Sequence, residues 1–304
     1  MQLQVKHINK SFKDNQVLTD ISFNVDAGRA FGFLGRNGAG KTTTMRILTG
    51  ILKADSGKVL IDGNPIDYRD LTIGYLPEER GLYSSEKLFS QLYYFARLKG
   101  ADRRFARQNV RYWLDRFDLD RYKNMEVSSL SKGMTQKVQI ITAFLADPDI
   151  LILDEPFTGL DPINAHELKL AVGEFIQNNK IVLLSSHVMS YVEEFCRDIC
   201  IIDSGRILLQ GDMYDIKSSM AQRKMLLSAN NIGIWDLKEL LESADLIYPD
   251  ALVRQFKLLV RIKDGISKED ILEFMMENNI DISCYKEYEA SLEDVFISKV
   301  GVSE

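Results

Sequence analysis

The residues best suited to chemistry form a glycine-rich stretch, Gly35–Thr43, with the sequence GRNGAGKTT. A phosphate group approaches backbone N–H groups closely only where side chains are absent, and the three glycines of this stretch allow that approach. The Lys41 ammonium is suited to the β- and γ-phosphates of a nucleotide, and the Thr42 hydroxyl to Mg²⁺. The predicted phosphate-binding residues are Gly35, Arg36, Asn37, Gly38, Ala39, Gly40, Lys41, Thr42 and Thr43.

The flanking residues predict the elements that hold this loop. Ala30–Leu34 is an apolar run short enough for a buried strand, and Thr43–Leu48 has the composition of a helix start. The order of strand, glycine loop and helix directs the positive end of the helix dipole toward a bound anion. The stretch is therefore predicted to bind a nucleotide through its phosphates.

Two strands are expected before this unit. Gln2–Ile8 alternates apolar and polar residues, with His7 a candidate for the inward face, and Val17–Val25 alternates less strictly. The predicted turn between them lies at Asp14 and Asn15, and Phe12 comes just before it. An exposed aromatic ring gives a nucleotide base a face on which to stack, so Phe12 is a candidate adenine platform.

A second chemical motif follows the apolar run Ile150–Leu153. Two carboxylates, Asp154 and Glu155, come directly after it, as in a central parallel strand whose C-terminal edge meets a ligand. Asp154 is expected to hold Mg²⁺ opposite Thr42, and Glu155 to polarise the attacking water.

Between these motifs lies Val127–Lys137, with the sequence VSSLSKGMTQK. Ser131 is suited to cap the helix that follows, so an ordinary helix start is one interpretation. Together with the two motifs above, however, the stretch resembles the signature loop of the ATP-binding cassette (ABC) ATPases, whose usual form is LSGGQ. The matching residues are Leu130, Ser131 and Gly133. Lys132 replaces the first glycine of that form, and Met134 replaces the glutamine.

The resemblance covers roughly residues 1–212 and implies further roles. Cassettes of this family pair head to tail, so that Ser131, Lys132 and Gly133 of one chain would complete the ATP site of another. Asp161, in the loop Thr158–Asp161, would lie at that subunit interface. His187, after the apolar run Ile181–Leu184, matches the histidine that contacts the γ-phosphate. A single cassette then implies a homodimer, or a heterodimer with a sibling cassette.

One position departs from the family in the metal site. After Ile73–Pro77 the family normally has a glutamine that contacts Mg²⁺ or water, and this chain has Glu78. A carboxylate ligates Mg²⁺ strongly but donates no hydrogen bond unless it is protonated. Glu78 is therefore a predicted metal ligand beside Thr42 and Asp154. With Glu78, the residues Glu79–Tyr83 resemble a subgroup found in bacterial export-type cassettes.

The region from about 84 to 146 is expected to be the helical subdomain of the cassette. Glu86–Lys99 and Arg103–Phe117 carry apolar residues at helical spacing, with one stripe formed by Leu88, Leu92, Phe95 and Leu98. In the family, a cytoplasmic helix of a membrane partner docks between this subdomain and the sheet. The candidate aromatic contacts for such a helix are Tyr83, Phe89, Tyr93 and Tyr94.

A second domain is predicted from residue 213 to 304. It reads as alternating strands and helices, with single strands expected at Val253–Ile262 and Leu246–Tyr248 and a last helix from Ser291. The predicted fold class is α/β: a P-loop NTPase with a RecA-like core, an antiparallel β subdomain and a helical insert. A small C-terminal α+β extension, similar to those of bacterial exporter cassettes, would follow residue 212.

Composition narrows the class of protein. The 304 residues are 45% hydrophobic, enough for a sizeable core, and no apolar run approaches membrane-spanning length. Residues 212–304 contain 18 acidic and 11 basic side chains, and the residues before them carry a net charge of +1. Neither part is a basic footprint for nucleic acid, which is disfavoured as a partner. Three cysteines are too few for a disulfide framework and are expected to be reduced.

Together with these motifs, the resemblance to the ATP-binding cassettes implies an ATP- and Mg²⁺-dependent ATPase that powers export through a separate polytopic membrane permease. The protein would be cytoplasmic and peripheral on the inner face of the cell membrane. An importer subunit is one alternative, because cassette motifs do not fix direction. A soluble cassette that acts on ribosomes or DNA is another, although the paired cassettes, long insertions and basic arms of that class are not seen in this sequence.

Overall fold

The computed structural model describes residues 1–78 and 81–301, and the chain divides into two compact units. The first comprises Met1–Met213 together with the described residues from Phe296 onward, and the second is Tyr214–Val295. Glu79 and Arg80, which belong to the export-type resemblance, lie outside the described residues. Among the described helices, none combines the length and apolar character needed to cross a membrane.

The first unit is built on a six-stranded sheet in the order β10-β9-β3-β8-β7-β6. All neighbouring strands are parallel except β10, which is antiparallel to β9. The strands are β3 (Ala30–Leu34), β6 (Ile73–Leu76), β7 (Ile150–Asp154), β8 (Ile181–Ser186), β9 (Asp198–Asp203) and β10 (Arg206–Asp212). Every residue of β3, β7 and β8 is buried, which explains why these strands are apolar up to the polar residues at the ends of β7 and β8.

A second sheet, antiparallel, has the order β2-β1-β4-β5. Its strands are β1 (Gln2–Phe12), β2 (Asn15–Asp26), β4 (Ser56–Ile61) and β5 (Asn64–Pro65). The inward placement considered for His7 is wrong. His7 has a φ of 54° at an irregularity in the pairing with β2, its side chain is exposed, and Ile8 takes the buried position.

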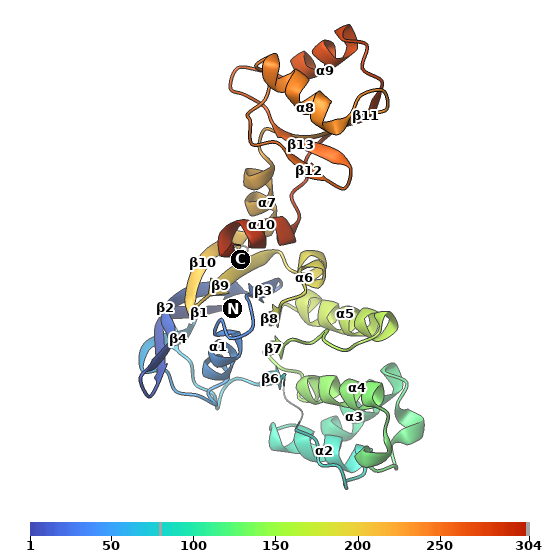
Figure 1. Ribbon diagram of the computed structural model, residues 1–304. Coiled ribbons are helices and arrows are strands. Elements are labelled where there is room, and N and C mark those ends of the chain that lie inside the picture. Colours follow the sequence, from blue (N-terminus) through green and yellow to red (C-terminus); the bar gives the residue numbers. More distant parts are fainter. Residues whose placement is uncertain (79–80, 302–304) are drawn as a thin grey trace. The chain divides into compact units, whose positions relative to one another are not determined.

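Helices cover both faces of the parallel sheet (Figure 1). On one face, α1 (Lys41–Leu48) packs with the antiparallel sheet into one core through Met45, Ile47 and Leu48. The helices of the other face are α4 (Lys132–Phe144), α5 (Pro162–Gln177) and α6 (Met189–Phe195). This arrangement is the α/β fold expected from the sequence.

The helical subdomain contains α2 (Leu88–Leu98) and α3 (Arg103–Arg116), followed by the short helices η1 (Asp120–Tyr122) and η2 (Val127–Ser129). The predicted apolar stripe of α2 is wrong at Leu98, which is 64% exposed, whereas Leu88 and Leu92 are fully buried. The buried face turns instead toward Gln91 and Ala96. Leu98 is the last residue of the helix, and although it follows the helical spacing, its side chain lies beyond the core and is exposed.

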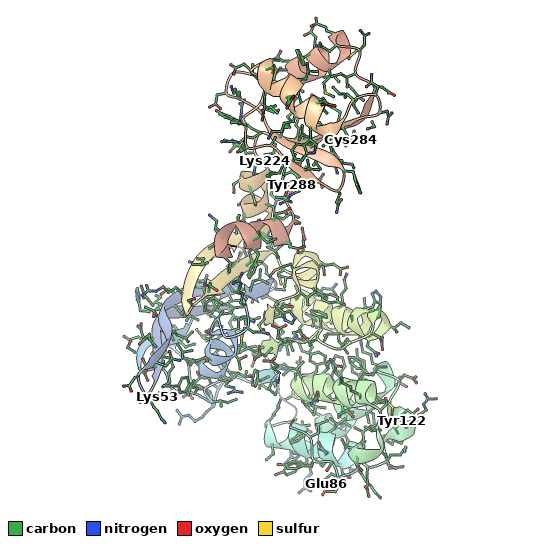
Figure 2. All side chains as sticks on the ribbon, viewed as in Figure 1. Lys53, Glu86, Tyr122, Lys224, Cys284 and Tyr288 are labelled. Carbon is green, nitrogen blue, oxygen red and sulfur yellow. The ribbon has the colours of Figure 1, made fainter. Side chains whose placement is uncertain are left out.

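The second unit is a four-stranded antiparallel sheet in the order β12-β13-β11-β14 with helices packed on it. Its strands are β11 (Lys224–Ala229), β12 (Leu252–Arg254), β13 (Lys257–Arg261) and β14 (Ile282–Glu287), and its helices are α8 (Ile234–Ser243) and α9 (Lys268–Glu277). Figure 2 labels Cys284 and Tyr288 in this unit. Two further helices, α7 (Met213–Ala221) and α10 (Leu292–Val300), cross the division between the units.

Two strand predictions in this unit are wrong. The expected single strand Val253–Ile262 is a hairpin, because Gln255 and Phe256 have φ values of 46° and 61° and reverse the chain. The expected strand Leu246–Tyr248 is reduced to one bridge between Ile247 and Ile262. The last helix begins at Leu292, one residue after the predicted start, with Ser291 and Asp294 joined as a reciprocal cap.

Candidate nucleotide site

The glycine loop connects β3 to α1 at the C-terminal edge of the parallel sheet. Gly40 precedes the first helical residue and has a φ of 109°, a conformation that L side chains rarely adopt. A Cβ at Gly40 would lie 2.5 Å from Cδ2 of Leu18, and one at Gly35 would lie 2.5 Å from the carbonyl oxygen of Ile202. The loop is held tightly against its neighbours, and both positions require glycine.

Lys41 is 5% exposed and folds back over the loop. Its Nζ donates to the carbonyl oxygens of Gly35 at 2.8 Å and Arg36 at 3.3 Å. The same Nζ lies 3.3 Å from Oε1 of Glu155, an ion pair between two buried side chains. The ammonium is thus held among three oxygen atoms, the surroundings that a phosphate group would also supply.

Asp154, at the end of β7, is 1% exposed. The hydroxyl of Ser185 donates to its Oδ1 at 2.5 Å, whereas its Oδ2 is buried with no hydrogen-bond partner in the described structure. A buried carboxylate oxygen without a partner is costly unless something binds it, and a divalent cation fits that need. Ser185 was missed by sequence reasoning, although its place two residues before His187 was a signal.

Glu155 and His187 form a second pair at this edge. Nδ1 of His187 lies 2.8 Å from Oε2 of Glu155, and the backbone N–H of His187 donates to the same oxygen at 3.3 Å. The backbone N–H of Glu155 donates to the backbone oxygen and the hydroxyl of Ser185 at 3.2 and 3.1 Å. Glu155 has a φ of 50°, so its backbone turns sharply and aims the carboxylate between Lys41 and His187.

Lys41 and Glu155 line a pocket of about 420 Å³, whereas Asp154 and His187 are not among its described lining residues. Its lining residues are Val17, Arg36, Asn37, Gly38, Gly40, Lys41, Thr42, Thr43, Glu78 and Glu155. Glu78 is exposed at its mouth, so the carboxylate that replaces the usual glutamine faces the same space as Thr42. Oxygen donors of Thr42, Glu78 and Asp154 are the ligand type that Mg²⁺ prefers.

Phe12 ends β1 and is 47% exposed. Its ring is open to a stacking partner, and Nζ of Lys10 lies 5.4 Å from the ring centroid. A cation beside an exposed ring suits a flat, electron-rich base near an anionic group. Phe12 is not among the described residues that line the phosphate pocket.

The signature residues lie at the start of α4. Ser131 caps this helix, its Oγ accepting from the N–H of Met134 at 3.3 Å, and a Cβ on Gly133 would meet no atom within 4 Å. Ser131, Lys132 and Gly133 are absent from the described lining of the phosphate pocket. The chain therefore does not gather the phosphate loop and these residues into one pocket.

Asp161 caps α5, where its Oδ1 accepts from the N–H of Asn164 at 2.9 Å. Gln136 of α4 donates to the carbonyl oxygen of Thr158 at 2.7 Å, joining the helix that follows the signature residues to the loop containing Asp161. Gln136 was missed by sequence reasoning because a buried glutamine on a helix gives no distinctive pattern.

The phosphate loop also contacts the end of the described chain: Nη2 of Arg36 donates to the carbonyl oxygen of Gly301 at 2.9 Å.

Comparisons with known proteins agree with this architecture. A family model described as ABC transporter matches residues 18–158, and one described as the ATP-binding protein DrrA1-3-like C-terminal domain matches residues 211–300. The chain is 39% identical to the uncharacterized ABC transporter ATP-binding protein YhaQ of Bacillus subtilis, over 98% of each chain. The chain belongs to the ABC transporter ATP-binding proteins.

Other relatives match a smaller share of the chain. The Nod factor export ATP-binding protein I of Cupriavidus pinatubonensis is 33% identical over 71% of this chain and 68% of its own length. A solved structure described as the ATP-binding subunit of an ABC transporter is 32% identical, with a TM-score of 0.68 over 73% of this chain and 95% of that one. The family implies ATP hydrolysis with Mg²⁺ and work with membrane permease subunits.

Proposed function

We propose that this chain hydrolyses ATP to drive export through a separate membrane permease. The observation that carries the proposal is the chain of contacts from Lys41 of the glycine loop to Glu155 and from Glu155 to His187, with Asp154 joined to Glu155 through the Ser185 hydroxyl. Each of these side chains supplies something that phosphoryl transfer to water needs: a cation for the phosphates, a metal ligand, a base and a group that orients the base.

Nucleotide binding would begin with an exchange of partners at Lys41. Its Nζ now contacts carbonyl oxygens of its own loop and Oε1 of Glu155, all of which a phosphate group would replace. Release of Lys41 leaves Glu155 free on the side of Oε1, while Oε2 stays bonded to His187. A carboxylate fixed on one side and open on the other is well placed to accept a proton from water.

Thr42, Asp154 and Glu78 would hold Mg²⁺, which neutralises charge on the transferring phosphoryl group. Asp154 fits this role because its Oδ2 is buried without a partner among the described residues. Phe12 would stack on adenine, as its exposed ring suggests.

A complete site would need a second copy of the cassette or a sibling. Ser131, Lys132 and Gly133 stand open at the start of α4, outside the described lining of the phosphate pocket of their own chain. In a head-to-tail pair they would meet the phosphates bound by the other chain, with Asp161 at the interface. ATP would favour the closed pair because its γ-phosphate makes contacts that exist only there, and hydrolysis would remove them.

Export is proposed over import because of the relatives. The name of the Cupriavidus relative specifies export, and the second unit matches a DrrA1-3-like C-terminal domain. The protein would sit at the inner face of the membrane through its permease. An importer subunit, or a soluble cassette on ribosomes or DNA, would recover different partners, so purification from detergent-solubilised cells tests this part of the proposal.

The catalytic part is tested with Glu155→Gln. The variant should bind ATP, lose turnover by about 10²-fold or more because the proton acceptor is gone, and accumulate as an ATP-bound dimer. Glu86→Gln is a matched control, since the Glu86 side chain is exposed (Figure 2). Hydrolysis by Glu155→Gln at the parental rate would show that Glu155 is not the base.

A further inference from the structure

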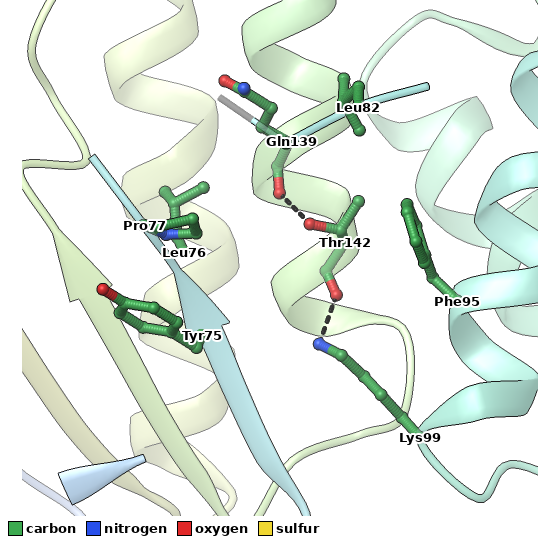
Figure 3. A pocket seen from close by; sticks show the side chains of 9 residues that line it. Tyr75, Leu76, Pro77, Leu82, Phe95, Lys99, Gln139 and Thr142 are labelled. Carbon is green, nitrogen blue, oxygen red and sulfur yellow. Dashed lines mark hydrogen bonds between the residues drawn. The ribbon is translucent and has the colours of Figure 1, made fainter. Parts of the chain in front are cut away.

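A pocket of about 150 Å³ lies between β6, α2 and α4, away from the phosphate loop. Figure 3 shows its lining side chains, with Leu82 and Phe95 on one side and, on the other, Tyr75 and Leu76 of β6 and Pro77 directly after it. An apolar cavity of this size holds a group as large as benzene. The pocket therefore has room for one side chain of another protein.

One charged group, Lys99, lies at this pocket, at the end of α2. Its Nζ donates to the carbonyl oxygen of Thr142 at 2.7 Å, in the last turn of α4 (Figure 3). An ammonium has three N–H donors, and this hydrogen bond uses one of them. The described contacts leave the other two donors without a protein acceptor.

The surroundings of Lys99 are unfavourable for its charge. Burial lowers the pKa of Lys99 to about 8, and no acidic neighbour among the described residues offsets that effect. At neutral pH most of the amine still carries its proton. A half-buried cation without a counterion is costly, so a carboxylate that entered the pocket would satisfy both the charge and the free donors.

A purely structural role for Lys99 is the competing explanation. Cations are favourable near helix C-termini, and the bond to Thr142 is of that kind. That role, however, accounts for one donor and does not require the open volume beside it. The pocket is mostly apolar and holds a cation with no described counterion, and its lining residue Phe95 contacts two exposed rings, Tyr83 (58% exposed) and Tyr94 (52% exposed). This combination fits a protein ligand better.

We propose that this pocket receives an Asp or Glu side chain from a cytoplasmic segment of the membrane partner, and that Lys99 is the residue that selects it. The carboxylate would accept hydrogen bonds from the Lys99 ammonium while its methylene groups contact Leu82 and Phe95. This inference rests on the proposed function and adds the chemistry of the contact: an acidic residue at the centre of the docking segment.

The first test is zero-length coupling of the complex purified from detergent-solubilised cells. A carbodiimide activates the partner carboxylate by bonding to one of its oxygens. The neutral Lys99 amine then attacks the carboxyl carbon to form an amide, and the carbodiimide leaves as a urea that carries that oxygen. After coupling at pH 8, mass spectrometry should find Lys99 joined to an Asp or Glu of the co-purified membrane protein. Coupling of exposed lysines alone would count against the proposal.

The second test uses Lys99→Met, which fills similar space without the charge. We expect at least about a tenfold loss of co-purified membrane protein, because the partner carboxylate would be buried unpaired. Lys99→Arg keeps a cation and should retain much more of the partner than Lys99→Met. Lys53→Met is the matched control, since Lys53 is exposed on the first unit (Figure 2).

The outcomes separate the two proposals. Lys99→Met should melt within about 3 °C of the parent, because it removes an unfavourable buried charge along with one hydrogen bond. If Lys99→Met recovers the membrane protein as well as the parent does, the carboxylate contact is wrong and the transporter function stands. If the parent chain recovers no membrane protein, the transporter function fails and this inference fails with it.

Discussion

The hydroxyl of Ser185, on β8, donates a 2.5 Å hydrogen bond to Oδ1 of Asp154, on the neighbouring strand β7. The same hydroxyl accepts from the backbone N–H of Glu155 at 3.1 Å. One small side chain thus orients both carboxylate residues of the site, and Oδ2 of Asp154, which has no partner among the described residues, stays available to a metal ion. Loss of a group that orients a metal ligand typically lowers metal affinity by roughly 10- to 100-fold.

Ser185→Ala should therefore raise the Mg²⁺ concentration for half-maximal ATP hydrolysis by about tenfold. The carboxylate of Asp154 would lose the donor that fixes its orientation. Ser185→Thr keeps the hydroxyl and should restore much of the parental Mg²⁺ response. Ser186→Ala is the control, because the Ser186 hydroxyl contacts Val188 instead. An unchanged Mg²⁺ curve in Ser185→Ala would remove Ser185 from the metal site.

Glu78→Gln tests whether the unusual carboxylate binds the metal. Glu78 faces the pocket that Thr42 and Lys41 line, so a negative charge there would add to Mg²⁺ affinity. The amide should raise the half-saturating Mg²⁺ concentration several-fold while ATP binding without Mg²⁺ improves, since one repulsive charge is gone. Mg²⁺ titrations of Glu78→Gln and of the exposed control Glu86→Gln give the comparison. Equal Mg²⁺ dependence would mean that Glu78 is not a ligand.

The two glycines with positive φ in the phosphate loop should respond differently to alanine. Gly38 has a φ of 81°, and a Cβ at this position would meet no atom within 4 Å, so Gly38→Ala should cost about 1 kcal/mol of backbone strain. Gly40→Ala adds a 2.5 Å contact with Leu18 to a φ of 109° and should lose more stability and most ATP binding. Thermal melting and nucleotide titration measure both effects. Equal losses would show that packing against Leu18 does not matter.

The sequence predicted those parts of the site whose chemistry restricts the residue type. A phosphate loop needs glycine and lysine at fixed spacing. An apolar strand followed at once by the two carboxylates Asp154 and Glu155 is also easy to recognise in a sequence. The geometry joined these residues to His187 through contacts between β7 and β8. Ser185 escaped prediction because a serine at a strand end is common; its place two residues before His187 was a weak signal, and the contact with Asp154 is what identifies its role.

Backbone conformation explains most of the wrong predictions. Gln255 and Phe256 occupy left-handed conformations that usually favour glycine or asparagine, so the turn between β12 and β13 had no sequence signal. The irregularity at His7 has the same origin. Leu98 follows the helical period, but a periodic pattern does not show where the neighbouring core ends, and the Leu98 side chain is exposed. Such features depend on tertiary contacts that local patterns do not contain.

Asp294 should make the stability of the second unit depend on pH in acid. Its carboxylate is 11% exposed and forms an ion pair with Arg254. Burial raises its pKa, but hydrogen bonds from Tyr288, Ser291 and Arg254 outweigh that effect and lower the pKa to about 2. Because the unfolded pKa is about 3.9, the folded state favours the ionised form, and the gain is present above pH 4 and lost as the pH falls toward 2.

Because solvent screens part of this interaction, the shift corresponds to at most about 2 kcal/mol of stability at neutral pH. Asp294→Asn should lose about that amount at pH 7 and show a flatter decline between pH 4 and 2 than the parent. Hydrogen exchange of amides in β13 follows this unit directly. Asp250→Asn is the matched control. Asp250 forms an ion pair with Arg261, its side chain is 55% exposed, and such surface pairs contribute about 0 to 1 kcal/mol. If both variants keep the parental decline in acid, Asp294 is not the group that sets it.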